Sequence, residues 1–100
     1  MKVKKGNYGY KIPAKVLKAD FTAFDLTGYT VKMKVWIKGA ETTKWILDGS
    51  ITDATKGKVE FTVENTHFIE VGNFLGELEL TSAGSVESTK SFAIEVEESL

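Results

Sequence analysis

The sequence contains no cysteine and only one histidine, and both scarcities narrow its chemistry. Without cysteine there can be neither a disulfide framework nor a thiolate ligand or nucleophile. The histidine, His67, has no evident nucleophilic partner, and a lone histidine does not make a typical zinc site by itself. We therefore expect His67 to be a surface or turn residue.

Motifs for covalent catalysis and phosphate binding are also missing. No Gly-x-Ser-x-Gly elbow surrounds a serine, and no glycine-rich phosphate loop precedes a helix. The aspartates Asp20, Asp25, Asp48 and Asp53 fall in predicted loops, but their spacing matches no known calcium loop, and we favour turn hydrogen bonding instead. The sequence therefore predicts no catalytic residue, no cofactor and no metal, in a protein that is not an enzyme.

A strong excess of charge and long apolar runs are absent as well. Thirteen basic and 14 acidic residues give a net charge of -1, which provides no general attraction to nucleic acid or anionic membranes. No segment approaches the roughly twenty apolar residues of a membrane span. The basic residues 1–6 precede a polar segment, unlike a secretory signal. We expect a soluble protein made in the cytoplasm, with no nucleic-acid or membrane partner.

What the sequence does contain is alternation of apolar and polar residues, clearest in residues 25–38. One face of this predicted strand carries Val31, Met33, Val35 and Ile37, and the other carries Thr30, Lys32 and Lys34. Trp36 breaks the pattern, because this large aromatic residue falls on the lysine face.

Further short runs of β-branched and aromatic residues are separated by glycine, aspartate and serine, as in an antiparallel sandwich or barrel. The additional predicted strands cover residues 10–17, 43–47, 50–52, 58–64, 74–80 and 90–97. Pro13 predicts an edge position for the first, because proline donates no hydrogen bond. Residues 38–43 read as a connection, residues 65–71 as a turn or short 3₁₀ piece, and residues 1–9 as a flexible arm. The sequence predicts one all-β domain, residues 1–100, with about seven strands in a two-sheet antiparallel β-sandwich or, as the alternative, a small barrel.

The last two predicted strands form a hairpin around residues 82–85. Pairing Leu78 with Phe92 places Gly76 opposite Ile94 and Phe74 opposite Val96. This register is attractive because it keeps the glutamates of one strand away from those of the other.

The tryptophans Trp36 and Trp45 are the candidate contact residues. They could stack on sugar rings, cover each other across neighbouring strands, or anchor a protein interface. Lys32 and Lys34 beside Trp36 superficially resemble a stacking platform for single-stranded nucleic acid, although so few residues support that interpretation weakly. Packing and protein contact both remain open, with Trp36, Trp45, Lys32 and Lys34 as the possible interface.

Several segments together resemble one family. They are Asp25-Leu26-Thr27-Gly28 before an alternating strand; Ile51-Thr52-Asp53 followed by Gly57, Val59, Phe61 and Val63; Gly72 with Phe74; Leu78-Glu79-Leu80; and Phe92-Ala93-Ile94-Glu95-Val96. In this order they resemble the N-terminal domain of the baseplate upper proteins of tailed phages that infect Gram-positive bacteria. Position 74 is phenylalanine where the family leads us to expect tyrosine.

The resemblance implies an immunoglobulin-like β-sandwich that acts as a structural attachment module in the phage tail or baseplate. The expected partners are other tail or baseplate proteins, with a homo-oligomer as a further possibility, and the expected location is the virion. The family offers no catalytic residues. The chain ends at Leu100 without a helical linker or receptor-binding domain, so we expect either an excised domain or a short structural protein. The alternative function is a carbohydrate-binding module of a surface protein, resting on the two tryptophans.

Overall fold

The computed structural model describes residues 1–40 and 42–99, and every regular element among them is a β-strand. The strands are β1 (Lys2–Lys4), β2 (Lys11–Lys15), β3 (Thr30–Ile37), β4 (Thr43–Asp53), β5 (Lys58–Thr62), β6 (Gly72–Ser82), β7 (Ser85–Ser88) and β8 (Phe92–Glu97). Residue 41, in the expected connection 38–43, and residue 100, at the end of the family resemblance, lie outside the described residues. The all-β prediction is confirmed.

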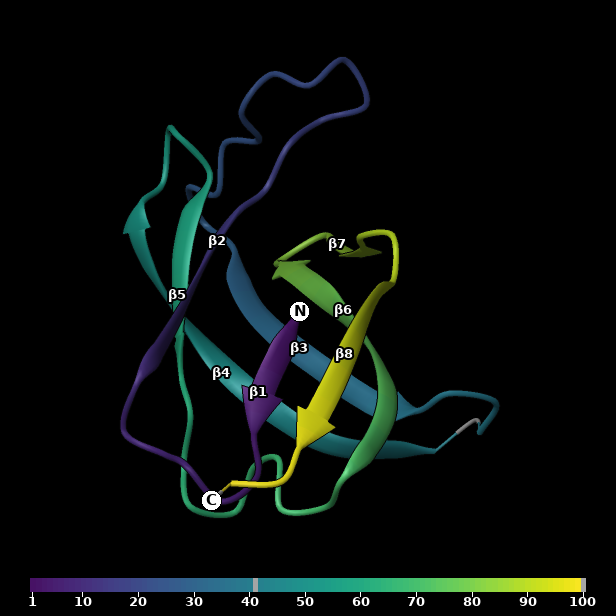
Figure 1. Cartoon of the computed structure of the whole chain (residues 1–100). Helices are drawn as coiled ribbons and strands as arrows, with labels where there is room; N and C mark the ends of the chain where they lie inside the picture. Colours follow the sequence, from purple (N-terminus) through teal and green to yellow (C-terminus); the bar gives the residue numbers. More distant parts are fainter. Residues whose placement is uncertain (41, 100) are drawn as a thin grey trace.

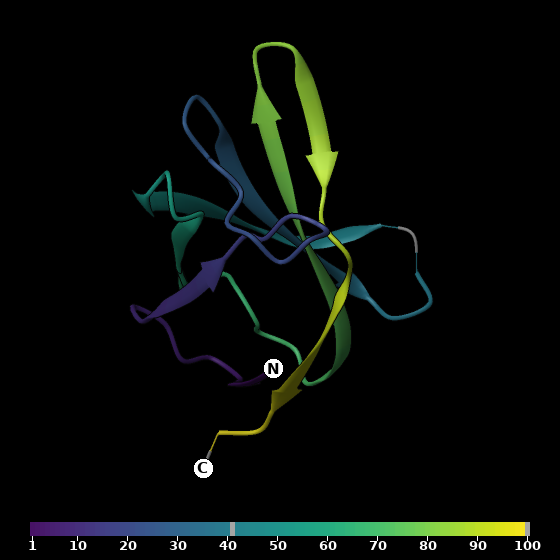
Figure 2. The ribbon, with the colours of Figure 1, turned by 90° about the horizontal axis from the view of Figure 1, so that it is seen from above.

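The strands form one curled sheet in the order β1-β8-β6-β3-β4-β5-β2, with β7 also paired to β6. Figures 1 and 2 show that the curl brings β2 and the β1–β8 pair to one side of the molecule, across from β3 and β4. Pairing is antiparallel except between β1 and β8, which run parallel, so the sheet is mixed. The immunoglobulin-like division into two antiparallel sheets is not confirmed, because the strand order continues from one end to the other.

Strand β4 makes the curl possible by changing partners halfway along. Its first part pairs with β3, up to Asp48 opposite Lys32, and its second part pairs with β5, from Gly49 opposite Phe61. The predicted strands 43–47 and 50–52 are therefore one continuous strand. A Cβ atom at position 49 would lie 2.8 Å from the carbonyl oxygen of Val31 and 2.9 Å from the Phe61 ring, so only glycine fits at this crossing.

The core fills the inside of the curl. The predicted inward face of β3 is confirmed for Val31, Met33 and Val35, which are at most 2% exposed, whereas Ile37 at the strand end is 42% exposed. Val59 and Phe61 of β5 are also buried as predicted. These strands show that the period-two pattern identified the buried face correctly.

The predicted register of the last two strands is wrong. Gly76 lies opposite Phe92 and Phe74 opposite Ile94, an offset of two residues from the expected pairing. A Cβ atom at position 76 would lie 2.8 Å from the end of the Ile94 side chain and 2.9 Å from the Phe92 ring. The aromatic ring therefore occupies the space that the glycine leaves open, a contact that matching apolar residues could not predict.

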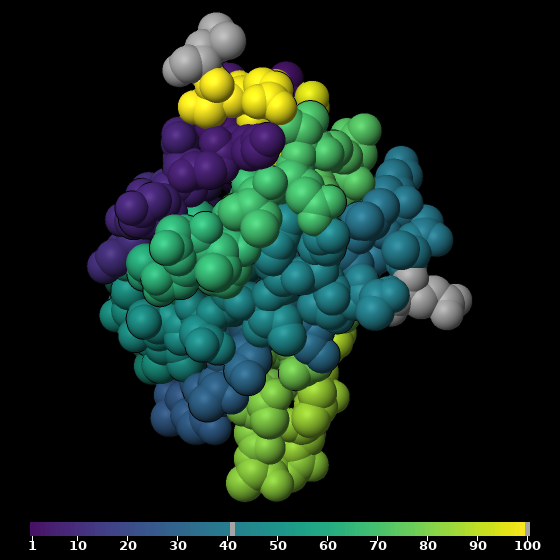
Figure 3. Space-filling view, turned by 90° about the horizontal axis from the view of Figure 1, so that it is seen from below, coloured from purple at the N-terminus to yellow at the C-terminus, as the bar shows by residue number. Residues whose placement is uncertain are grey.

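One further strand, β7, was not predicted from the sequence. Residues 85–88 form β7, which pairs with the C-terminal part of β6, from Ser82 opposite Ser85 to Glu79 opposite Ser88. Thr89 then accepts a hydrogen bond from the Leu78 amide through its hydroxyl oxygen, at 3.0 Å. The β6–β7 hairpin projects from the body of the molecule in Figure 3.

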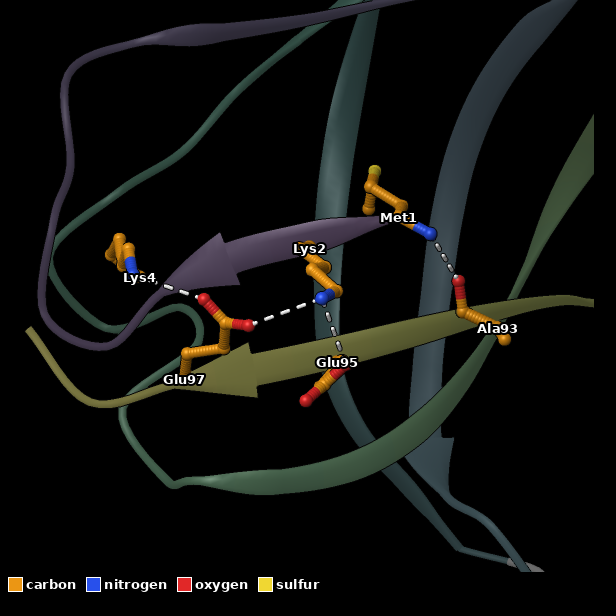
Figure 4. Close-up of polar contacts among 6 residues, drawn as sticks. All are labelled: Met1, Lys2, Lys4, Ala93, Glu95 and Glu97. Atoms are coloured by element: carbon orange, nitrogen blue, oxygen red, sulfur yellow. Dashed lines mark hydrogen bonds and ion pairs between the residues drawn. The ribbon is translucent and has the colours of Figure 1, made fainter.

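The N-terminal segment, for which we expected a flexible arm, joins the sheet through β1. The Met1 ammonium donates to the Ala93 carbonyl oxygen at 3.0 Å, and Lys4 contacts Glu97 at the same distance (Figure 4). Lys2 lies 3.6 Å from Glu97 and 3.9 Å from Glu95. Exposed ion pairs of this kind contribute little individually. The 7% exposure of Val3 shows that β1 also contributes to the core.

Strand β2 ends the sheet, as Pro13 predicted. The Val63 amide donates to the Tyr10 carbonyl oxygen, and the Val16 amide donates to the Gly57 carbonyl oxygen. Because backbone groups alternate in direction along an antiparallel strand, the nitrogen of Pro13 points away from β5. Its missing N–H therefore removes no bond from the sheet.

We predict that Gly49→Ala lowers the free energy of unfolding by about 1–3 kcal/mol, because the added methyl group must displace the Val31 backbone and two core side chains. Urea denaturation measures the change. Gly84→Ala is the control, since a Cβ atom there meets nothing within 4 Å, and its effect should stay within about 0.5 kcal/mol. Equal effects of the two substitutions would contradict a steric constraint at the β4 crossing.

Candidate functional site

The two candidate tryptophans have different environments. Trp45 is only 7% exposed and belongs to the core. Its ring packs edge-on against Phe68, with centroids 5.5 Å apart, and tilted against Phe74 at 4.8 Å. The proposed interface role of Trp45 therefore needs correction, because its ring offers no open face to a partner or a sugar. A sugar platform made from both tryptophans is not formed.

Trp36 lies half-buried on the outer face of the sheet. Its neighbours across the strands are Leu75 of β6 and Thr43 of β4. A shallow hollow of about 370 Å³ surrounds it, lined by Lys34, Trp36, Ala40, Thr43 and Glu77. We call Trp36, Leu75 and the hollow the Trp36 patch.

The other two candidate residues lie on the same outer face, next to carboxylates. Lys34 forms an ion pair with Glu79 at 2.5 Å. Lys32, which is exposed, has Asp48 and Glu79 as its neighbours on the adjoining strands. The lysine stripe seen in the sequence is therefore matched by acidic residues and does not form a cationic groove beside Trp36.

His67 lies in a turn, as expected, but it is buried, with 9% of its surface exposed. Its Nδ1 accepts a hydrogen bond from the Glu64 amide at 3.0 Å, and its Nε2 lies 3.0 Å from the Ile46 carbonyl oxygen. Since an amide can only donate, the geometry requires a neutral ring with the proton on Nε2. The ring therefore links residues 65–71 to the part of β4 that β5 leaves uncovered.

Three of the four candidate aspartates serve turns. The carboxylate of Asp25 accepts hydrogen bonds from the Thr27 amide at 2.9 Å and the Thr27 hydroxyl at 2.6 Å. Asp20 accepts the corresponding pair from Thr22, and Asp53 accepts from the Thr55 hydroxyl at 3.2 Å. The loop position expected for Asp48 is wrong, because this residue lies within β4.

These turn hydrogen bonds affect protonation. The Thr27 hydroxyl, followed by the Thr27 amide, lowers the pKa of Asp25 below its ordinary value. Thr22 lowers the pKa of Asp20 through the same two groups. A depressed carboxyl pKa means that each turn is stabilised above the unfolded-state pKa, and that this contribution is lost as the pH falls through the folded-state pKa.

A larger groove was not anticipated from the sequence. It has a volume of about 940 Å³ and lies between the end of β2 with the following loop and the β6–β7–β8 edge. Its apolar lining is Ala14, Val16, Leu17, Ala19, Phe21, Phe24, Leu78, Leu80 and Phe92, and its charged lining is Lys15, Lys18, Glu87 and Lys90. We call this feature the edge groove. No local signal marked it, because its two walls lie far apart in the sequence.

Within residues 1–40 and 42–99, the structure contains neither a metal-binding cluster nor a membrane-spanning helix. No group of three or more histidine, cysteine, aspartate or glutamate side chains is placed to hold a metal ion there. In the same residues, no helix has the length and apolar character that crossing a membrane would require.

The fold and the two surface features define a small all-β domain whose candidate sites are contact surfaces. The family model of the BppU N-terminal domain matches residues 2–100. The chain therefore belongs to this family, the N-terminal domains of phage baseplate upper proteins, and is a structural domain of the phage tail baseplate. The resemblance found in the sequence is confirmed.

A solved structure supports the fold. The N-terminal domain of phage TP901-1 ORF48 is similar to this chain with a TM-score of 0.74, at 15% sequence identity, over 96% of this chain and 82% of that one. At this identity the similarity concerns the fold alone. Comparison with curated protein sequences gives no match.

We predict that Thr27→Val raises the pKa of Asp25 towards its ordinary value of 3.8, because the side-chain hydrogen bond is its largest depressing influence. Carboxyl carbon chemical shifts recorded during a pH titration measure the pKa. Asp20, whose turn depends on Thr22, is the control within the same molecule and should titrate unchanged. An unchanged Asp25 titration would contradict the assigned cause.

We also predict that nitrogen chemical shifts will show His67 as the Nε2–H tautomer at neutral pH. His67→Ala should lower the free energy of unfolding by about 1–3 kcal/mol, since it leaves two backbone groups without their partner. Val71→Ala, at a position 49% exposed, is the control and should have little effect. Detection of the Nδ1–H tautomer would disprove the linking role.

Proposed function

We propose that this domain is a non-catalytic attachment module that binds another protein of the phage tail or baseplate. The observation that carries the proposal is its family: the BppU N-terminal domain model matches residues 2–100. The proposal includes residence in the assembled virion after synthesis in the host cytoplasm. It requires neither nucleic acid nor a membrane, and a homo-oligomer of the domain is a compatible arrangement.

The Trp36 patch is the proposed first contact surface. A half-buried tryptophan on an outer sheet face can bury its remaining surface against a partner, and tryptophan is enriched among residues that dominate interface energies. Ile46, which is 47% exposed, lies across from Lys34 on the same face and extends the apolar area. The ion pair of Lys34 with Glu79 provides a polar border. A central apolar residue with a polar rim is the usual arrangement of an interface.

We predict that Trp36→Ala weakens binding of the domain to purified tail baseplates by about tenfold or more, with an unchanged fold, because the substitution removes an aromatic anchor. Biolayer interferometry measures binding, and circular dichroism with thermal unfolding tests the fold. Tyr8→Ala is the matched control, since Tyr8 is an aromatic residue 64% exposed that does not line the hollow around Trp36.

Two results would count against this surface. If Trp36→Ala unfolds the domain, Trp36 is a packing residue of the sheet. If binding is as strong as that of the Tyr8→Ala control, the Trp36 patch is not the contact. Failure of the unaltered domain to bind any tail or baseplate protein would overturn the proposed function itself.

A further inference from the structure

Unpaired strand edges border the edge groove on both sides. On one side, β2 pairs only with β5, and its other edge has no strand partner among the described residues. On the other side, β7 pairs only with β6 in the same part of the chain. Strand β1 covers β8 from Glu95 to Glu97, and the Met1 ammonium reaches Ala93, so the β8 edge before Ala93 is also uncovered.

The β7 edge has the better set of free backbone groups. The Thr89 amide donates to the Leu78 carbonyl oxygen, so Thr89 points its backbone groups towards β6. By alternation, Ser88 and Val86 point their amide and carbonyl groups away from β6. On the β2 edge, the outward-pointing Pro13 has no N–H to offer. An additional strand would therefore find its hydrogen-bond partners on β7.

The floor of the groove is apolar. Leu78 and Leu80 of β6 line it but are themselves only 6% and 3% exposed, and half-buried Phe24 lines it from the loop after β2. Leu17 on the rim is 44% exposed, and Phe21 is 82% exposed with a φ of 66°, in the left-handed region that non-glycine residues rarely adopt. Leu17 and Phe21 therefore leave apolar surface open to a partner that places alternate side chains into the groove.

The charges on the rim favour an acidic occupant. Lys15, Lys18 and Lys90 line the groove together with one acidic residue, Glu87. Asp20 and Asp25 lie near enough to Lys18 for its charge to lower their pKa, so Lys18 is partly compensated. Lys15 and Lys90 form no ion pair with the described residues.

We propose that the edge groove binds an extended segment of another tail protein, with alternating apolar and acidic side chains, as an additional strand on β7. Backbone hydrogen bonds to Val86 and Ser88 hold the segment, its apolar side chains cover Leu17 and Phe21, and its acidic side chains lie near Lys15 and Lys90. Strand addition of this kind obtains affinity from the main chain and specificity from the side-chain pockets. The inference rests on the proposed function and specifies the chemistry of one partner.

The test uses the 100-residue chain and a synthetic peptide in which valine and leucine alternate with glutamate. Amide hydrogen exchange followed by NMR should show slower exchange at Val86 and Ser88 when the peptide is added. The Glu87 amide, which alternation points towards β6, should change little. Protection at Lys15 without protection at Val86 and Ser88 would place the peptide on β2 and overturn the assignment to β7.

The charge requirement has its own control. A peptide with lysine in place of glutamate should bind at least about tenfold more weakly, and Lys90→Glu together with Lys15→Glu should reduce or reverse this preference. Lys38→Glu, at an exposed position that does not line the groove, should leave it unchanged. Equal binding of the two peptides would show that the edge groove has no preference for an acidic segment, and the inference would fail.

The apolar requirement is tested by Leu17→Ser, which should weaken binding of the glutamate peptide several-fold. Ile69→Ser is the matched control, because Ile69 is also 47% exposed and lies outside the groove. If both variants lose the same affinity for the glutamate peptide, the peptide does not bind in the edge groove.

Binding to purified baseplates separates this inference from the proposed function. If Lys15→Glu with Lys90→Glu leaves baseplate binding intact while Trp36→Ala reduces it, the groove inference fails and the attachment function stands. If the unaltered domain does not bind baseplates but the peptide results are as expected, the attachment function fails and the groove is a peptide site of another kind.

Discussion

The absence of a side chain at Gly49 is the constraint on which the curl of this sheet depends. At that residue β4 passes so close to the Val31 carbonyl oxygen and the Phe61 ring that no Cβ atom fits. The close approach lets one strand exchange β3 for β5 without interrupting its hydrogen bonding. The two ends of the sheet are thereby brought to the same side of the molecule, and the edge groove exists because they approach without pairing.

The strands differ in how far their backbone groups find hydrogen-bond partners. Along β4, β5 pairs with one part and the His67 ring bonds the Ile46 carbonyl oxygen in the other, while Trp45 packs beneath on Phe68 and Phe74. The β2 and β7 edges have no such cover among the described residues. The part of β4 near His67 is therefore covered on both edges, whereas the β2 and β7 edges leave backbone groups open to further pairing.

Alternation in residues 25–38 and 58–64 was sufficient to predict both strands and their buried faces, because period two is a local property. The register between β6 and β8 is not encoded by a local sequence pattern, because it depends on the Phe92 ring covering Gly76. The burial of Trp45 depends on aromatic residues from distant segments, and β1 is too short to show a period. The edge groove was unpredictable for the same reason, whereas the order of degenerate motifs did reveal the family.

The position of β8 between β6 and β1 has a mechanical consequence. Force applied along the axis of β8 would load its antiparallel ladder with β6 and its parallel ladder with β1 at the same time. Hydrogen bonds that lie across the direction of pull share the load in shear, so many must break together instead of opening one after another. In a tail component under tension, β6 and β1 would both resist displacement of β8, and the short β1 would add this resistance along the outer edge of β8.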